Sequence, residues 1–172
     1  RSSLVGSEMC IRDSNRKVYI SGEIVPEVDA KISIFDSAVL LGDTVTESTR
    51  TFNFKPFKLD EHLERLYKSF KLTRIDPQMT IEEMKKVSLE LLEINKDNYK
   101  ANEDCWLVHN ISRGHSITGG NPALQVSKPT VMIYTQPMNL VLWAPFYTKG
   151  CHAVTPPTRM VPSQSLDARI KN

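Results

Sequence analysis

The chain has 172 residues, of which 40% are hydrophobic, so a globular domain with a real core is expected and a disordered chain is not. A formal net charge of +2, from 22 basic and 20 acidic residues, gives no electrostatic case for a nucleic-acid or membrane partner. Cys10, Cys105 and Cys151 form no CxxC pair, and the four histidines show no metal-ligand spacing. No disulfide framework or metal site is therefore predicted, and a reduced, cytoplasmic protein without a membrane span is expected.

The first fourteen residues differ in character from the rest of the chain. Residues 1–14 have a basic start but no long apolar centre, so they do not read as a signal peptide. We predict a non-native or disordered tail that carries no function. The fold prediction therefore begins at residue 15.

Short strands are predicted along the next segment. Residues 17–26 contain two strand-like runs around Ser21-Gly22, a pattern typical of a hairpin. Residues 30–43 begin as an alternating strand and pass into a loop that Gly42 and Asp43 close. Residues 44–59 alternate again, which places one set of side chains on one face and a second set on the other: Val45, Glu47 and Thr49 against Thr46, Ser48 and Arg50.

Two amphipathic helices follow. The first begins near Asp60, a suitable N-cap, and carries an apolar stripe formed by Leu59, Leu63, Leu66, Tyr67 and Phe70. A polar stripe of His62, Arg65 and Ser69 lies beside it. The second helix, residues 80–96, begins with Thr80 and has Glu83 three residues on, which is a capping-box pattern.

The last third of the chain returns to strands. Residues 104–114 and 129–137 read as strands separated by a loop, residues 138–150 are ambiguous, and residues 151–172 hold a short strand and then three prolines. This order lacks a regular βαβ alternation. We predict an α/β fold, α+β in detail, with a mostly antiparallel sheet and two helices over residues 15–136. Residues 137–172 are predicted to be an interdomain linker and the start of a truncated second domain.

Three spaced segments together resemble one family. There is no GxGxxG, P-loop or GxSxG motif, but residues 35–69 resemble the amino-terminal signature of the class IV aminotransferases, the fold-type IV pyridoxal-phosphate (PLP) enzymes. Arg113-Gly114 matches a strand end that several members share, and "LDARIKN" at 166–172 is similar to the segment that bears the Schiff-base lysine. The resemblance covers residues 17–172, and the order of the three segments makes it specific.

The resemblance assigns the cofactor residues. It implies that Lys171 forms the Schiff base with PLP and then moves the substrate α-proton, as a lysine amine in a partly desolvated site can do. The residues alone leave open that Lys171 is an ordinary solvated surface lysine. Arg65, in the "HLERL" segment, is implied to bind the cofactor phosphate with its guanidinium fork. From the helix alone, the alternative for Arg65 is a surface ion pair with Glu61.

Further positions fit the family pattern less decisively. We interpret Gly42 as a backbone requirement and Asp36 as a loop hydrogen-bonder, and Asp43 also fits. Glu47 either lines the site or is a buried structural carboxylate.

The predicted substrate residues depart from the familiar patterns. Thr46 stands where many members have an aromatic residue, and Trp106 and Val108 match neither the Tyr-x-Arg nor the Phe-x-Glu pair of characterised subfamilies. The Arg-x-His pair of D-amino-acid enzymes falls on residues 118–120 and is absent. Plain core packing remains the alternative for Trp106 and Val108.

The sequence therefore predicts a PLP-dependent aminotransferase that moves an amino group between an amino acid, branched-chain-like, and a 2-oxo acid. The resemblance implies a homodimer and a second domain that supplies the acid for the pyridine nitrogen, so the chain alone is expected to be nearly inactive. Two alternatives stay open. One is a PLP-dependent lyase of the same family that acts on aminodeoxychorismate, and the other is a non-catalytic domain of the same fold.

Overall fold

A single antiparallel sheet forms the framework of the protein. The computed structural model describes residues 15–100, 103–115, 128–138, 140–162, 164–165 and 167–171. Its strands are β1 (Lys17–Ile20), β2 (Glu23–Pro26), β3 (Thr44–Phe52), β4 (Lys55–Pro56), β5 (Cys105–Ser112) and β6 (Thr130–Pro137). They form a six-stranded sheet in the order β2-β1-β6-β5-β3-β4, with antiparallel pairing between all neighbours. The predicted antiparallel sheet and its hairpin at Ser21-Gly22 are confirmed.

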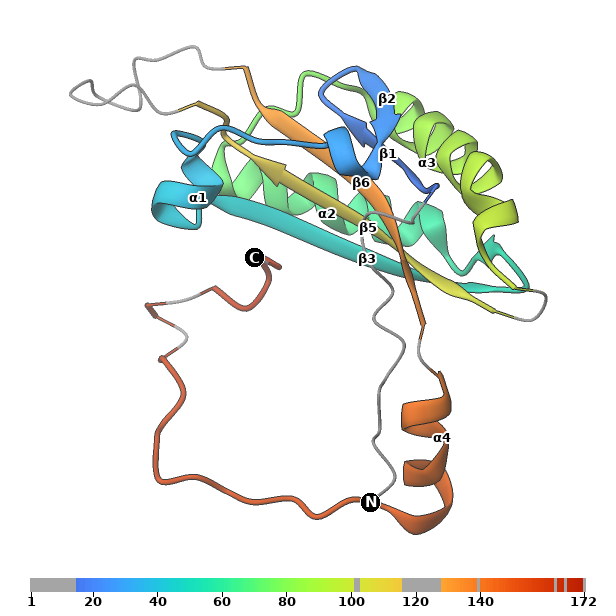
Figure 1. Ribbon diagram of the computed structural model, residues 1–172. Helices are drawn as coiled ribbons and strands as arrows, with labels where there is room; N and C mark the ends of the chain where they lie inside the picture. Colours follow the sequence, from blue (N-terminus) through green and yellow to red (C-terminus); the bar gives the residue numbers. More distant parts are fainter. Residues whose placement is uncertain are drawn as a thin grey trace.

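Two long helices, α2 (Leu59–Thr73) and α3 (Ile81–Asn95), cover one face of this sheet (Figure 1). The helix α1 (Ser37–Leu41) precedes β3, and the short 3-10 turns η2 (Glu27–Asp29) and η3 (Lys96–Asn98) follow β2 and α3. The helix α4 (Leu140–Lys149) follows β6 and has no buried residue. None of the helices in the described part of the chain is long and apolar enough to cross a membrane.

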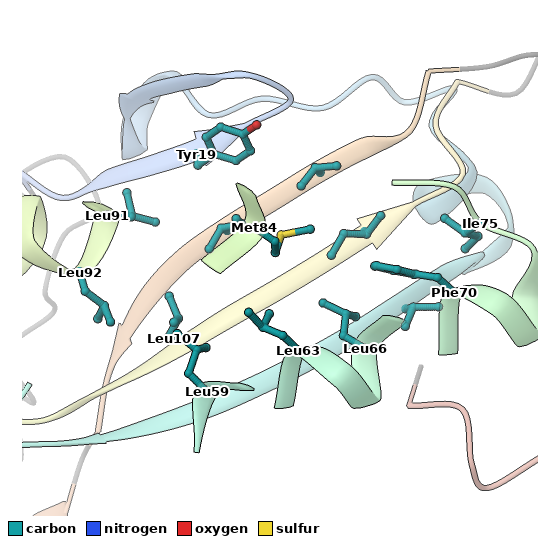
Figure 2. Packing of buried hydrophobic residues seen from close by; sticks show 14 of the residues in the cluster. Tyr19, Leu59, Leu63, Leu66, Phe70, Ile75, Met84, Leu91, Leu92 and Leu107 are labelled. Atoms are coloured by element: carbon teal, nitrogen blue, oxygen red, sulfur yellow. The ribbon is translucent and has the colours of Figure 1, made fainter. Parts of the chain in front are cut away.

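The core lies between the sheet and the two long helices (Figure 2). The predicted apolar stripe of α2 faces inward, and the leucines of this stripe and Phe70 are at most 6% exposed. Inward side chains of the strands meet them, among which Val45, Leu107, Ile111 and Ile133 are fully buried. The alternation predicted for β3 is confirmed, because Val45, Glu47 and Thr49 are all fully buried.

The two long helices begin with different caps. The capping box of α3 is confirmed, since the Thr80 hydroxyl accepts from the Glu83 N–H and the Glu83 carboxylate accepts from the Thr80 N–H. Asp60 as the N-cap of α2 is wrong. The helix begins one residue earlier, at Leu59, and its cap position is Lys58, which makes no side-chain capping bond. Asp60 instead lies in the first turn and forms an ion pair with Lys85 of α3 at 2.6 Å.

Two predicted strands are absent from the described residues, and one helix was not predicted. Residues 30–35 pair with no strand and end in a turn, and residues 151–155 form no strand either. The helix α1 follows residue 36, with the Asp36 carboxylate accepting from the Ala38 N–H at 2.8 Å. Gly42 ends it at φ +66°, as the predicted backbone requirement demands. The loop predicted at 115–128 and the tail at 1–14 lie almost wholly outside the described residues.

Candidate active site

A buried glutamate lies at the centre of the candidate site. The alternation of β3 turns Glu47 toward α2, and its side chain is fully buried. The strand register places it directly across from His109 of β5. A carboxylate in such a position requires hydrogen-bonding partners, because an unpaired buried charge is strongly unfavourable.

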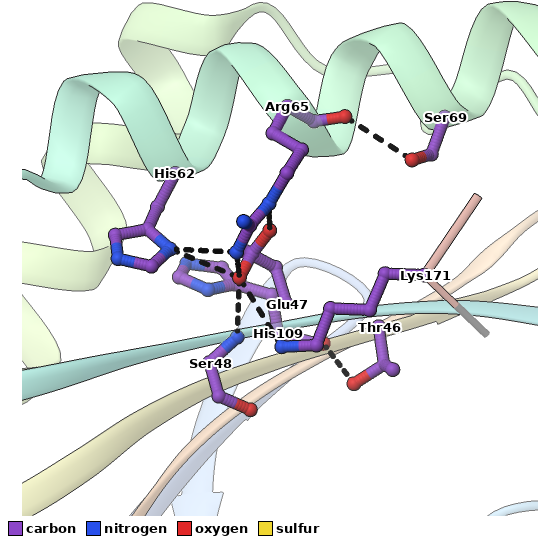
Figure 3. Close-up of polar contacts among 8 residues, drawn as sticks. All are labelled: Thr46, Glu47, Ser48, His62, Arg65, Ser69, His109 and Lys171. Atoms are coloured by element: carbon purple, nitrogen blue, oxygen red, sulfur yellow. Dashed lines mark hydrogen bonds and ion pairs between the residues drawn. The ribbon is translucent and has the colours of Figure 1, made fainter. Parts of the chain in front are cut away.

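The helix α2 supplies two of these partners (Figure 3). The Arg65 guanidinium donates from Nε to Glu47 Oε2 and from Nη2 to Oε1, both at 2.7 Å. The His62 Nδ1 lies 3.0 Å from Glu47 Oε1, and the Ser48 N–H donates to the same oxygen at 2.9 Å. His62 and Arg65 reach one carboxylate because residues three apart lie on the same side of a helix. The alternative for Arg65, a surface ion pair with Glu61, is not found in the described residues, where Arg65 pairs with Glu47 and Glu61 pairs with Lys58.

The fourth partner comes from the far end of the sequence. The Lys171 amine lies 3.3 Å from Glu47 Oε1, and the Lys171 carbonyl accepts from the Thr46 N–H at 2.8 Å. This backbone contact forms on the outer edge of β3, where β4 pairs only with Thr51 and Phe52. Ile170, which is partly buried, packs against the core. The segment that carries Lys171 is thus attached to β3 by backbone and side-chain contacts and to the core through Ile170.

These contacts determine the charge of the glutamate. Burial alone would raise the pKa of Glu47, but hydrogen bonds from Arg65, His62 and the Ser48 N–H, together with the charge of Lys171, outweigh burial and lower the pKa to about 2. The same pair raises the pKa of Arg65 through its hydrogen bonds to Glu47. Glu47 is therefore an anion at neutral pH, surrounded by cationic and hydrogen-bonding groups.

A neutral histidine lies beneath this cluster. The Ser88 hydroxyl donates to the Met84 carbonyl at 2.7 Å, so its oxygen accepts from His109 Nε2, also at 2.7 Å. This chain places the His109 proton on Nε2, and within the described residues its buried Nδ1 has no hydrogen-bond partner. Burial lowers the pKa of His109 to about 4, so the ring is neutral at neutral pH. His109 therefore adds no positive charge under Glu47.

The predicted substrate residues lie on the opposite face of the sheet from α2. Thr46 is turned away from α2 and its hydroxyl donates to the His109 carbonyl at 3.2 Å. Val108 pairs in register with Ser48, and Trp106 pairs with Arg50. Val108 is only 6% exposed, whereas Trp106 is half-buried and its ring lies 6.5 Å from that of Trp143 in α4. The structure thus groups Thr46, Val108 and Trp106 on one face of neighbouring strands, and Lys171 reaches the edge beside Thr46.

The role of Glu47 and His62 was not predicted from the sequence. The sequence allows Glu47 to be either a site residue or a buried structural carboxylate, and it places His62 only on a polar stripe. The available signal was a charged residue at an inward position of an alternating strand, next in the sequence to a helix with a polar stripe.

A second polar cluster supports the end of β5. The Arg113 guanidinium donates to the Asp43 carboxylate at 2.7 and 3.3 Å and to the Thr73 and Arg74 carbonyls that end α2. Gly114 follows at φ +94°, where an added Cβ would lie 1.9 Å from the Lys128 carbonyl oxygen. Arg113 therefore connects the end of β5 with Asp43 and the end of α2, and Gly114 lets the chain pass close to Lys128, which precedes β6. The predicted position of the D-amino-acid carboxylate pair, 118–120, lies outside the described residues.

Known structures share this fold. A T.th. branched-chain amino acid aminotransferase complexed with N-(5'-phosphopyridoxyl)-L-glutamate aligns with 91% of the chain and 50% of its own length, at a TM-score of 0.74 and 23% identity. The branched-chain amino acid aminotransferase from Escherichia coli aligns with 72% of the chain and 41% of its own length, at a TM-score of 0.61 and 25% identity. The fold is that of the amino-terminal domain of the fold-type IV aminotransferases.

The family follows from the sequence comparison. The chain belongs to the class IV aminotransferases, because the family model "Amino-transferase class IV" matches residues 44–172. A putative branched-chain-amino-acid aminotransferase of Methanocaldococcus jannaschii is 36% identical over 156 residues, which cover 91% of the chain and 51% of that protein. A D-alanine aminotransferase of Staphylococcus epidermidis is 32% identical over 120 residues, 70% of the chain and 41% of that protein. The chain spans about half the length of these relatives.

Proposed function

We propose that this chain forms the amino-terminal part of a PLP-dependent aminotransferase, with Lys171 as the residue that attaches the cofactor and Arg65 as its phosphate ligand. One observation supports the proposal above the others. A primary amine and a guanidinium from distant parts of the sequence meet on one carboxylate, in a family whose members depend on PLP.

The residues present fit this cofactor. The side chains of Lys171 and Arg65 are 41% and 53% exposed, so both are accessible from solvent although Glu47 is buried. Arg65 uses Nε and Nη2 for Glu47, and its Nη1 has no hydrogen-bond partner within the described part of the chain. A guanidinium nitrogen that remains available suits a phosphate oxygen, and a lysine amine suits an aldehyde carbon.

The chain's own residues divide the work in the following way. PLP, when bound, supplies the electron sink that makes the substrate α-proton acidic. Lys171 would attach the cofactor through its amine, and the same amine, once released, would carry the proton at the substrate α-carbon. Arg65 would hold the cofactor phosphate and thereby orient the cofactor relative to Lys171. Thr46, Val108 and Trp106 bound the space for the substrate side chain on the open face of β3 and β5.

The substrate class and the domain plan are also proposals. A branched-chain-like amino acid and a 2-oxo acid are supported by the named activities of the relatives and by the small, partly apolar surface of Thr46 and Val108. We assign residues 15–136 to the amino-terminal domain and 137–172 to a linker and the start of a second domain. The match to about half of each relative supports this assignment.

The cellular setting completes the proposal. A homodimer is supported by apolar side chains exposed on α1, namely Val39, Leu40 and Leu41, which are 54%, 46% and 70% exposed. A cytoplasmic location is supported by the free thiols of Cys105 and Cys151.

The proposal is tested by locating the cofactor chemically. The purified chain is mixed with PLP, its visible absorbance is recorded, and borohydride reduction is followed by peptide mapping. We expect the label on Lys171, with loss of that label in Lys171→Ala and retention in Lys149→Ala, where an exposed helix lysine is removed. Labelling spread over many lysines, or unchanged in Lys171→Ala, contradicts the assignment.

Activity is tested on a longer protein. We expect the chain alone to transfer little and a chain extended by a relative's second half to aminate a 2-oxo acid. Release of pyruvate from aminodeoxychorismate without any acceptor would identify a lyase instead.

A further inference from the structure

Glu47 differs in burial from the side chains that contact it. Its side chain is fully buried, whereas those of Arg65, Lys171 and His62 are 53%, 41% and 24% exposed. Burial restricts the carboxylate, whereas the side chains that contact it reach solvent and keep more rotational freedom.

The carboxylate itself has little freedom to move. The Ser48 N–H donates to Oε1, and the Glu47 side chain is fully buried. Strand register holds the Glu47 backbone opposite His109 of β5. A buried group bound in this way is a fixed reference point for flexible side chains that approach from solvent.

Both proposed cofactor residues use the same oxygen of this fixed group. Glu47 Oε1 accepts from Arg65 Nη2 at 2.7 Å and from Lys171 Nζ at 3.3 Å (Figure 3). Arginine and lysine side chains have many rotamers, and fixing them loses entropy. A shared acceptor reduces the number of relative positions that the amine and the guanidinium adopt.

We propose that Glu47 is the positioning residue of this site, which sets the place of the Lys171 amine relative to the Arg65 guanidinium. The proposal rests on the proposed function, since that function gives the two cations their roles. Glu47 acts through them, because its carboxylate is buried behind both. The spacing between an amine and a phosphate-binding group is what a cofactor with an aldehyde at one end and a phosphate at the other requires.

The surroundings of Glu47 are consistent with this role. The charged or titratable groups that face it are His62 and Arg65 from α2, His109 from β5, and Lys171. His109 is held neutral with its proton directed to Ser88. His109 therefore gives Glu47 no positive charge, and Arg65 and Lys171 are the cations that contact the carboxylate within the described residues.

Glu47→Gln separates charge from shape. Glutamine keeps the size of the side chain and an oxygen for the Ser48 N–H, while Arg65 and Lys171 reach water and leave no buried unpaired cation. The first readout is amide hydrogen exchange at Thr46, whose N–H donates to the Lys171 carbonyl, measured by NMR. We expect exchange at Thr46 to become about tenfold faster in Glu47→Gln, the effect of losing one charge-assisted hydrogen bond. Amides of β6 are expected to keep their rates.

Two further variants complete the exchange experiment. Glu27→Gln removes the carboxylate of another bidentate arginine pair, with Arg16, next to β2, which lies four strands from β3 in the sheet. This variant is expected to leave exchange at Thr46 unchanged. Glu47→Asp restores the charge on a shorter side chain and is expected to recover part of the protection. Unchanged exchange at Thr46 in Glu47→Gln overturns the proposal. An equal acceleration at Thr46 and in β6 also overturns it, since that is the result of a purely structural role.

The second readout is the borohydride label itself. With PLP as the probe, we expect the fraction of label on Lys171 in Glu47→Gln to fall about tenfold below that of the unaltered chain at equal PLP. Label on Lys171 that is equal in both proteins contradicts positioning while supporting the proposed function. No label on Lys171 in the unaltered chain contradicts the proposed function, and Thr46 exchange still decides whether Glu47 positions Lys171.

Discussion

Replacement of Glu47 is expected to make the free energy of unfolding depend less on pH below about pH 5. The pKa of Glu47 is about 2 in the folded protein, against an ordinary value of 4.5. A folded-state pKa below the unfolded value means that the folded protein prefers the ionised form. Its contribution to stability is therefore complete above the unfolded pKa and is lost as the pH falls toward 2.

The size of the effect follows from the shift. At 1.36 kcal/mol per pKa unit, the drop from 4.5 to about 2 corresponds to roughly 3 kcal/mol. Because a domain of this size has ~5–15 kcal/mol of total stability, that contribution is large enough to measure. Other carboxylates also titrate in this range, among them Asp167 and Glu83, whose pKa values are lowered by hydrogen bonds. Comparison of the unaltered chain with Glu47→Gln cancels the effect of these carboxylates, since both proteins retain them.

Urea unfolding at a series of pH values provides the measurement. The free energy of unfolding is determined between pH 7 and pH 2.5 for the unaltered chain and for Glu47→Gln. We expect the difference between the two proteins to be constant above about pH 5 and to shrink by roughly 3 kcal/mol toward pH 2. Glu64→Gln, which removes an exposed carboxylate 3.8 Å from Lys68, serves as the control for loss of a surface carboxylate. Parallel curves for Glu47→Gln and the unaltered chain would refute the reasoning, since they would mean that Glu47 has the same pKa in both states.

Three further predictions concern the scaffold. Leu63→Ala removes a fully buried core side chain and is expected to lower the free energy of unfolding by about 3 kcal/mol. Leu72, on the same helix, is 46% exposed, so Leu72→Ala is expected to change that free energy by less than about 0.5 kcal/mol. Urea unfolding measures both variants. Gly114→Ala is expected to destabilise the protein by about 3 kcal/mol or more, because φ is +94° and the new Cβ would meet the Lys128 carbonyl. Gly22→Ala, at φ +112° but with open space around the new Cβ, is expected to destabilise it by only about 1 kcal/mol. Thermal unfolding compares the two variants, and equal losses would contradict the steric argument. Burial raises the pKa of Cys105 to about 11, so a thiol reagent at pH 8 is expected to modify the exposed Cys151 at least ~100-fold faster, as read by peptide mapping; similar rates would contradict the burial of Cys105.

The periodic elements were predictable because periodicity reports burial. The alternation of β3 and the stripe of α2 reflect one inward face in each element, and the structure turns both faces toward each other. The capping box of α3 was equally readable, since it depends only on Thr80 and Glu83. Local patterns of this kind need no knowledge of the partner element.

The segment between β2 and β3 was not predictable from its pattern. Ile32 and Ile34 alternate with polar residues, as in a strand, but a strand also needs a neighbour to pair with. Here Ile34 is 70% exposed and residues 30–35 pair with none. The signals for α1 were present in Asp36, a good N-cap, and in Gly42, a good helix end. They frame only five residues, too few for a helical period to emerge.

The helix α4 illustrates a different limit. Residues 140–149 are almost uniformly apolar and contain Pro145, so no amphipathic period distinguishes helix from strand. The structure makes them a helix whose residues are all exposed, from Leu140 to Lys149. Sequence patterns locate an element by what it buries. An element that buries nothing in this chain therefore gives no pattern to read.

The candidate site shows which part of a constellation lies within reach of sequence reasoning. The inward position of Glu47 and the polar stripe with His62 and Arg65 are local facts, and their combination already requires that the buried charge find partners on the adjacent helix. The contact with Lys171 is different, because it depends on a long irregular segment returning to the free edge of β3. No periodicity encodes that return. An acidic residue at an inward strand position still predicts that positively charged side chains lie beside it. Among the described residues, Arg65 and Lys171 contact Glu47, and they are the two residues to which we assign cofactor binding.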